Sequence, residues 1–546
     1  MAKKNLSGNS PESALFGFGR VHRRENRPVR LQILWSRVFL AGFFLFVAAW
    51  FATAGVLFYF FKHRHGYEEV KYSKMLVLPF RLDDHRKEMG DFHVEKGLES
   101  LRQGDLRPAL HLLRTGVARS KSNSEGRMAL AQIFHSGLQR PDLAADILEE
   151  GLRYSDENPN FLKVEYLQPL FRLLLNNQYD ARVTELSDQV LPRLIEGSDE
   201  FITIVFATAQ ANIFRGNYSE AERILEQFNL LGSPQGQILL AQIRWNRGLE
   251  DRAIAILHQA LSRFPARDDL YSTLMRYYRE QESWELVRRY SALRSIRFPE
   301  KAGPMIDRLY ALDATGEDEL INEGANEIFN RFPPNESAIL LAQFGASTGR
   351  TDIARIAYDK AIESDLGIGP FALLLLESLI RAGDYEIALQ FSNQLREDRP
   401  DWLIPYQSLE NAFRSLAMYG LGRELDAEIF VREFLKSDRT RSQTHIAVAN
   451  LFSSVGSPEI ANQILVEGYS RNSGNQPLLS SLVLNEIQLN DDRDFVRRLR
   501  DLLRMRVPDE EVLSLAYQEL GSDDYLFLKD REQLLSRIEE LIVNPG

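Results

Sequence analysis

Hydrophobic and polar residues follow two different patterns along this chain. Between Arg37 and Lys62 lie 24 residues, Val38 to Phe61, without a charged side chain. From about residue 90 onward, apolar residues recur at helical spacing in short stretches that end in glycine or proline. The pattern therefore predicts one long apolar helix followed by many short amphipathic helices.

A tripeptide shows that the amphipathic stretches repeat. Arg-Phe-Pro occurs at residues 263–265, 297–299 and 331–333, and each copy lies 34 residues after the last. A fixed period of this size indicates a chain built by stacking one small helical unit. Because proline cannot continue a helix, each copy is expected to end the second helix of a pair.

The rest of the unit follows when the chain is aligned on these prolines. Upstream of Pro265 stand Leu240, Ala241, Gly248 and Ala253. Small residues let two helices approach closely, and glycine supplies the turn between them. The small position of the second helix recurs at spacings of 34, 34, 33, 34, 39 and 34, through Ala253, Val287, Ile321, Ala354, Ala388, Ala427 and Ala461. The stretches 158–198 and 476–508 keep the helical periodicity but have a degenerate frame.

This frame resembles the tetratricopeptide repeat (TPR) family over residues 90–546. The resemblance implies an all-α fold, a right-handed α-solenoid of about 11–12 TPR-like helix pairs. An amphipathic stretch at residues 532–543 is predicted to be its carboxyl-terminal capping helix.

In the TPR family the first helix of each unit lines a concave groove that receives peptides or proteins. Projecting these groove positions onto this chain gives Phe206, Gln210, Ile213, Phe214, Ile238, Gln242, Trp245, Asn246, Arg276, Arg279, Tyr310 and Asp313. Exposed aromatic residues beside amides and arginines fit protein recognition. For Phe206, Ile213 and Ile238 ordinary packing explains the residue type equally well.

The uncharged run predicts a transmembrane helix at residues 37–62. As a helix its 24 residues span about 36 Å, enough to cross a hydrocarbon core of about 30 Å. A cleaved signal peptide is the alternative, since Ala52-Thr53-Ala54 looks like a cleavage site, but this site lies inside the run. Ala48, Ala52 and Gly55 share one face, where they would allow another helix to approach closely.

Charge is divided unevenly around this helix. Residues 1–37 carry a net charge of +6 in a chain of net −11, so residues 38–546 carry −17. An acidic body argues against nucleic acid as a partner. The basic tail, residues 1–36, is predicted to lack regular structure.

Six arginines from Arg20 to Arg37 precede the run, and five basic residues follow it within a similar distance. This weak bias favours a cytoplasmic amino terminus and leaves the opposite topology open. Residues 63–89 are predicted to join anchor and solenoid. Their apolar stretch Met75–Phe80 is expected to cap the first repeat, with a position at the membrane surface as the alternative.

The sequence contains none of the motifs that carry chemistry. There is no phosphate-binding Gly-x-x-x-x-Gly-Lys-Ser/Thr, no His-Glu-x-x-His and no Gly-x-Ser-x-Gly. The absence of cysteine excludes disulfides, thiolate metal sites and cysteine nucleophiles. We therefore expect a protein that is not an enzyme and that uses no cofactor or metal.

These features favour a membrane-anchored scaffold that presents a TPR groove to peptide or protein partners, with residues 38–61 in the membrane. The expected location is a bacterial inner membrane, with the solenoid outside the cytoplasm. Two alternatives remain open: a structural or assembly subunit of an envelope export or polysaccharide system, and an organelle-surface import-type receptor with a cytosolic TPR domain.

Overall fold

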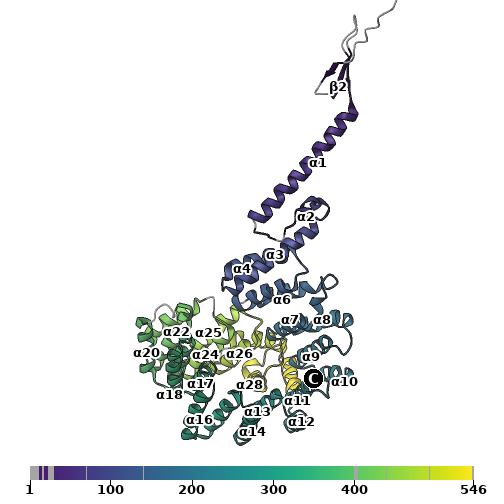
Figure 1. Ribbon diagram of the computed structural model, residues 1–546. Coiled ribbons are helices and arrows are strands. Elements are labelled where there is room, and N and C mark those ends of the chain that lie inside the picture. Colours follow the sequence, from purple (N-terminus) through teal and green to yellow (C-terminus); the bar gives the residue numbers. More distant parts are fainter. Residues whose placement is uncertain are drawn as a thin grey trace, which may run out of the picture. The chain divides into compact units, whose positions relative to one another are not determined.

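The computed structural model describes residues 12–14, 18–22, 30–64, 66–68, 70–138, 140–398, 404–437, 440–490 and 492–543. Most of them are helical (Figure 1). The chain divides into two compact units, Met1–Tyr166 and Leu167–Gly546, which are described separately below.

Three short strands stand before the first helix. They are β1 (Glu12–Ala14), β2 (Gly19–His22) and β3 (Arg30–Ile33), and they form an antiparallel sheet in the order β1-β2-β3. In the register of β2 and β3, Val21 lies opposite Leu31. The structure differs from the predicted lack of regular structure only at these strands, because residues 1–11, 15–17 and 23–29 of the tail 1–36 lie outside the described residues.

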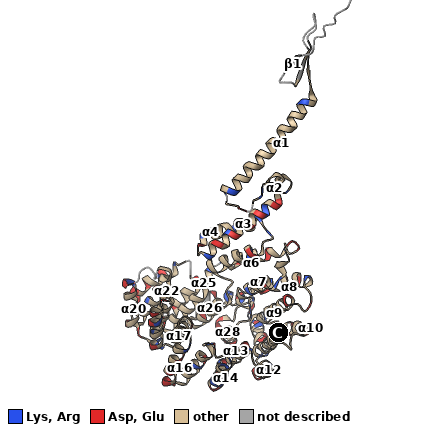
Figure 2. Ribbon diagram, viewed as in Figure 1, with Lys and Arg blue, Asp and Glu red and all other residues tan. Residues whose placement is uncertain are grey.

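The predicted apolar helix is present as α1 (Trp35–Tyr59), which continues into a π-helical turn at Phe60–Arg64. Together they form one helix of 30 residues, Trp35–Arg64, long and apolar enough to cross a membrane. Figure 2 shows this helix uncharged between a basic residue near each end. Its bounds lie within two residues of those predicted.

The rest of the first unit is helical as well. It contains α2 (Tyr72–Leu76), a 3₁₀ turn at Leu78–Phe80, α3 (Leu82–Arg102), α4 (Leu106–Arg119), α5 (Ser124–Gln132) with a π-helical turn at Ile133–Gly137, and α6 (Pro141–Leu152). The paired helices begin at Leu82, eight residues before the predicted start of the solenoid, because α3 extends backward toward α1.

The second unit is built entirely from short helices in its described residues. They are α7 (Val164–Asn176, which starts just before the unit boundary), α8 (Asp180–Val190), α9 (Asp199–Phe214), α10 (Tyr218–Gln227), α11 (Pro234–Asn246), α12 (Glu250–Arg263), α13 (Asp268–Glu280), α14 (Trp284–Arg297), α15 (Gly303–Thr315), α16 (Asp318–Arg331), α17 (Pro334–Thr348), α18 (Thr351–Glu363), α19 (Ile368–Ala382), α20 (Tyr385–Asp398), α22 (Gln407–Gly420), α23 (Glu424–Leu435), α24 (Ser442–Ser454), α25 (Pro458–Arg471), α26 (Gln476–Leu489), α27 (Asp492–Leu503), α28 (Glu510–Gly521) and α29 (Arg531–Val543).

Taken two at a time, the described helices from α3 to α29 form thirteen consecutive pairs. The prediction of an α-solenoid is confirmed. There are slightly more pairs than the 11–12 predicted, in part because α29, expected as a lone cap, is the second helix of a pair with α28.

A residue with positive φ makes the turn inside most pairs. These residues are Gly104, Gln178, Gly216, Gly248, Glu282, Gly316, Gly349, Gly383, Gly422, Gly456 and Asn490. The residue that follows the positive-φ residue closes the turn, because its N–H donates a hydrogen bond to the carbonyl oxygen five residues earlier. Examples are Leu249 N to Arg244 O (2.9 Å) and Asp384 N to Leu379 O (2.9 Å). The turn predicted from the glycines is confirmed, and Gln178, Glu282 and Asn490 make it without glycine.

The Arg-Phe-Pro copies end the second helices as predicted. Helices α12, α14 and α16 stop at the arginine of each copy. The phenylalanine N–H of each copy still donates a hydrogen bond to the carbonyl oxygen four residues earlier. The distance from Phe264 N to Ala260 O is 2.8 Å. The small position five residues after each turn is buried, with Ala253, Ala354 and Ala427 fully inaccessible.

We expect the close approach of the two helices in a pair to be intolerant of one added methyl group. A Cβ on Gly345 in α17 would lie 2.8 Å from Ala354 N and 2.8 Å from Arg350 O, both backbone atoms of the partner segment. Gly345→Ala should cost about 1–3 kcal/mol, so that α17 and α18 open roughly 5- to 150-fold more often. Hydrogen exchange of these two helices measures this, because a repeat array opens locally.

Gly303→Ala is the matched control, since a Cβ there meets nothing within 4 Å. Exchange in α17 and α18 that is unchanged by Gly345→Ala would contradict the proposed close packing.

Candidate functional site

The predicted groove residues lie on the first helices of four successive pairs in the second unit. Helix α9 carries Phe206, Gln210 and Phe214; α11 carries Gln242, Trp245 and Asn246; α13 carries Arg276 and Arg279; and α15 carries Tyr310 and Asp313. Of the residues for which packing was the equal alternative, Ile213 is buried, and Phe206 and Ile238 are partly buried against core clusters.

An aromatic stack forms the centre of this surface. The ring of Trp245 lies flat on that of Tyr277, with centroids 3.9 Å apart and an interplanar angle of 4°. The Arg276 guanidinium lies 5.2 Å from the centroid of the Tyr277 ring. Asn246 and Arg276 are exposed, whereas Tyr277 is buried. We call Trp245, Asn246, Arg276, Tyr277 and Glu280 the Trp245 cluster.

Burial governs the ionisation of this cluster. Desolvation raises the pKa of Tyr277 to about 12, so its hydroxyl stays protonated. Desolvation also raises the pKa of Glu280, although Arg276 and a hydrogen bond from Trp245 favour the carboxylate. The cluster thus presents the exposed guanidinium of Arg276, which pairs with the exposed Glu280 carboxylate at 3.8 Å, beside the stacked aromatic rings.

Other predicted groove residues join neighbouring pairs to each other. Gln210 Nε2 lies 3.3 Å from Gln242 Oε1, and Arg279 pairs with Asp307 at 3.3 Å. Likewise Tyr310 bonds Ser347 (2.9 Å) and Asp313 pairs with Arg350 (2.6 Å). These side chains therefore hold the solenoid together in addition to lining its surface.

Sequence reasoning missed several of the partners in these contacts. Tyr277, Asp307, Ser347 and Arg350 each stand 28 to 37 residues after the groove residue that they contact. The repeat period was the signal that could have found them, since equivalent positions of adjacent pairs lie side by side. Burial raises the pKa of Asp307 in spite of Arg279 and Arg294 beside it.

The connection between α27 and α28, residues 504–509, returns to the first pairs of the second unit (Figure 1). Arg506 forms a two-pronged ion pair with Asp180, with Nε–Oδ2 at 2.8 Å and Nη2–Oδ1 at 2.7 Å, and also donates to Leu175 O. Val507 N donates to Phe214 O at 3.0 Å. We call these the closing contacts.

A further bond strengthens this closure. Gln178 Oε1 accepts from Gln476 N, the first residue of α26, at 2.9 Å. Because the guanidinium of Arg506 lies 3.9 Å from the centroid of the Phe214 ring, Phe214 is partly covered by the chain itself. The predicted groove surface open to a partner is thereby centred on α11 and α13.

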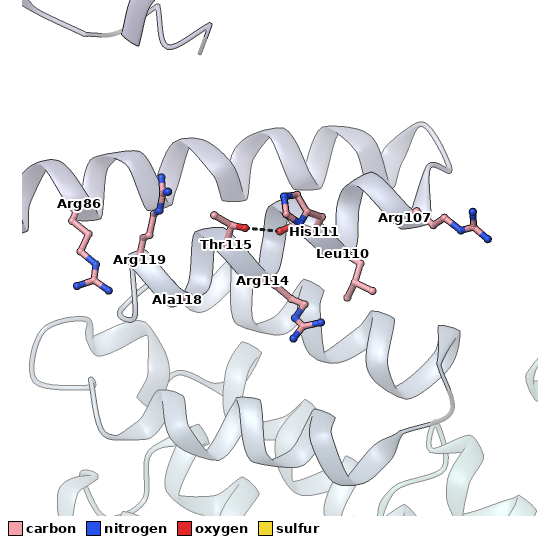
Figure 3. A pocket seen from close by; sticks show the side chains of 8 residues that line it. All are labelled: Arg86, Arg107, Leu110, His111, Arg114, Thr115, Ala118 and Arg119. Carbon is pink, nitrogen blue, oxygen red and sulfur yellow. Dashed lines mark hydrogen bonds between the residues drawn. The ribbon is translucent and has the colours of Figure 1, made fainter. Parts of the chain in front are cut away.

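The first unit carries a different candidate surface on α3 and α4, shown in Figure 3. Four arginines and one histidine line an open cavity of about 570 Å³ together with Leu110, Thr115 and Ala118: Arg86, Arg107, His111, Arg114 and Arg119. We call these five residues the basic face. No carboxylate lines the cavity.

The arginines of the basic face are unlike others in the same unit. Arg81, Arg127 and Arg140 each pair with a carboxylate, at 3.0, 3.1 and 2.7 Å. None of the four basic-face arginines has an ion-pair partner within the described residues. Their charge is therefore available to an anionic group.

Within the described ranges, no group of three or more His, Asp or Glu side chains is placed to hold a metal ion.

No protein-family model matches the chain, and no curated protein matches it. The solved structures to which it is similar include the three that follow. The first, from a structure of the APC/C hetero-tetramer Cut9-Hcn1, has 13% identity and a TM-score of 0.26, over 82% of this chain and 96% of that one.

The second is a tetratricopeptide repeat protein from Parabacteroides merdae, with 14% identity and a TM-score of 0.29, over 46% of this chain and 98% of that one. The third, from a structure of Naa15/Naa10 bound to HypK-THB, has 15% identity and a TM-score of 0.27, over 90% and 76%. None of these likenesses assigns a function to this chain.

We expect the closing contacts to depend on Arg506. Asp180 is only 2% exposed, so Arg506→Ala leaves a buried carboxylate without its partner, at a cost of about 3–5 kcal/mol. Residues 504–509 should then become sensitive to limited proteolysis, and α7 and α8 should exchange faster. Arg506→Lys should give an intermediate result, because lysine cannot form the two-pronged pair.

Arg504→Ala is the matched control in the same connection. The Arg504 side chain is 77% exposed, and its ion pair with Asp501 is long, at 3.7 Å. Equal cleavage of the two alanine variants would show that Arg506 does not hold the connection in place.

Proposed function

We propose that this chain is a membrane-anchored scaffold that binds protein or peptide partners through the Trp245 cluster. The observation that carries the proposal is the flat stack of Trp245 on Tyr277 with Arg276 beside it. Tryptophan, tyrosine and arginine are the residues that most often dominate binding energy at protein interfaces. The stack holds Trp245 in one position, which lowers the entropy lost when a partner binds.

We further propose that α1 is the membrane anchor and that the protein binds without performing chemistry. Its length and apolar surface support the anchor. The six arginines from Arg20 to Arg37 support a cytoplasmic amino terminus with the solenoid on the other side, as in a bacterial inner-membrane protein.

A structural or assembly subunit of an envelope system is the second candidate. The basic face favours it, since this chain would then carry two separate binding surfaces, one in each unit. An import-type receptor requires the opposite topology, with the solenoid in the cytosol.

The binding role predicts a position-specific cross-link. A photoreactive amino acid at the exposed position Asn246 should capture one defined partner in living cells, and Arg276→Ala should lower its yield. Loss of an exposed arginine anchor costs about 1–2 kcal/mol, or roughly 5- to 30-fold in affinity. Photocross-linking followed by mass spectrometry measures the yield.

The same reactive group at Arg252, exposed on the second helix α12, is the control and should capture no such partner. A yield at Asn246 that Arg276→Ala leaves unchanged would remove the Trp245 cluster as the binding surface.

Topology gives an independent prediction. An enzyme reporter that is active only outside the cytoplasm, fused after Gly546, should be active, because long carboxyl-terminal domains cross the membrane largely regardless of their own charge. If a cytoplasmic fluorescent fusion at the same position is bright and the exported reporter is silent, the import-type receptor becomes the better assignment.

A further inference from the structure

The segment between α1 and α3 folds back along α1. Trp50 Nε1 donates to Leu76 O at 2.9 Å, and Tyr72 Oη donates to Phe51 O at 2.9 Å. The ring centroid of Phe80 lies 6.3 Å from that of Trp50. The apolar stretch expected to cap the first repeat is therefore packed beside the predicted membrane helix.

A small core fixes this arrangement. Ala54, Tyr67, Val70, Met75 and Met89 form one cluster in which each residue is at most 5% exposed. Met89 belongs to α3, so the segment is packed between α1 and the start of α3.

The small residues of α1 serve this contact. A Cβ on Gly55 would lie 3.9 Å from Tyr72 Cε2, and Ala54 is buried in the cluster. Tyr72 thus packs near Gly55 at a distance that would also accommodate alanine.

The far end of the segment is apolar and uncovered. Val77 is 47%, Phe80 85% and Leu82 61% exposed, and we call residues 77–82 the apolar tip. Next to Phe80 the ring of Trp50 also contacts that of Phe46, at 5.8 Å, and Phe46 is 60% exposed. The tip and the middle of α1 therefore form one continuous apolar surface, which is unfavourable in water.

The position of the apolar tip along α1 determines whether lipid or water surrounds the tip. Trp50 stands 11 residues before Phe61, which places it about 16 Å inside the uncharged run. If α1 spans a bilayer, a side chain level with Trp50 is held at the membrane. The tip thus continues the apolar surface that α1 itself presents to lipid.

Charges beside the tip limit how far it enters. Arg81 and Lys74 both bind Glu88, at 3.0 and 2.6 Å, so these cations are paired. Asp83 and Asp84 begin α3 and are exposed, and carboxylates are costly in hydrocarbon. A position among acyl chains therefore suits the apolar tip and is unfavourable for the exposed carboxylates at the start of α3.

We propose that the apolar tip inserts into the bilayer beside α1 and contacts lipid acyl chains, as a second membrane contact. This inference rests on the proposed function, in which α1 anchors the protein in the membrane. The tip fixes the level at which the first helix pair stands at the membrane, because α3 starts directly at Leu82.

The absence of cysteine makes a direct test possible in the full chain. Phe80→Cys and Val77→Cys are spin-labelled and reconstituted in liposomes of phosphatidylcholine and phosphatidylglycerol. Phe44→Cys, in the middle of α1, is the lipid-exposed reference, and Arg114→Cys on the basic face is the water-exposed reference. Both tip side chains are exposed, so neither substitution removes a buried side chain, and Val77→Cys keeps the ring contact between Phe80 and Trp50 that Phe80→Cys removes.

Collision rates with oxygen and with a water-soluble nickel chelate give the result. We expect the ratio of oxygen to nickel collisions at Phe80→Cys and Val77→Cys to exceed that at Arg114→Cys several-fold and to approach that at Phe44→Cys. Tip labels that resemble Arg114→Cys, or that are closed to both reagents, while Phe44→Cys remains lipid-like, would overturn the tip and leave the anchor intact. A water-like Phe44→Cys would instead overturn the anchor and, with it, the inference.

Discussion

The sharp turn between the two helices of a pair is the constraint on which the structure depends. At Gly248 and Gly383 the backbone takes a positive φ, and the residue after it closes the turn with a hydrogen bond five residues back. The second helix is thereby directed back onto the first, so that the position five residues after the turn, Ala253 or Ala388, is buried between them. Each pair then has one shape, and stacking such pairs builds a solenoid through neighbour contacts alone.

This constraint explains why so much of the fold was readable from sequence. Glycine, alanine and proline mark the turn, the close contact and the helix end, and each acts within one pair. Gln178, Glu282 and Asn490 were harder, because they make the same turn without glycine, against a local strain of about 1 kcal/mol each. The position of the apolar segment after α1 was not readable either, since its hydrogen bond from Trp50 to Leu76 joins two parts that carry no shared pattern.

The candidate site was predictable only in part, for a related reason. The repeat frame placed Trp245 and Arg276 on first helices, where the structure has them. It did not show that Asp313 and Tyr310 pair with the next repeat, or that Phe214 is partly covered by Arg506. Arg506 and Asp180 are 326 residues apart, and no spacing rule connects positions at that distance. Neighbour contacts follow from the period, whereas closure depends on the accumulated rotation of many pairs.

That closure changes the mechanical character of the second unit. A stack of helix pairs in which each pair contacts only its neighbours bends easily, since small rotations at each interface add up along its length. A buried ion pair between the first and the last helix pairs of this unit joins the two ends of the stack. Bending that changes the radius of the stack then strains this one ion pair. The strain is no longer distributed over many weak interfaces. The surface formed by α11 and α13 consequently keeps a nearly constant curvature.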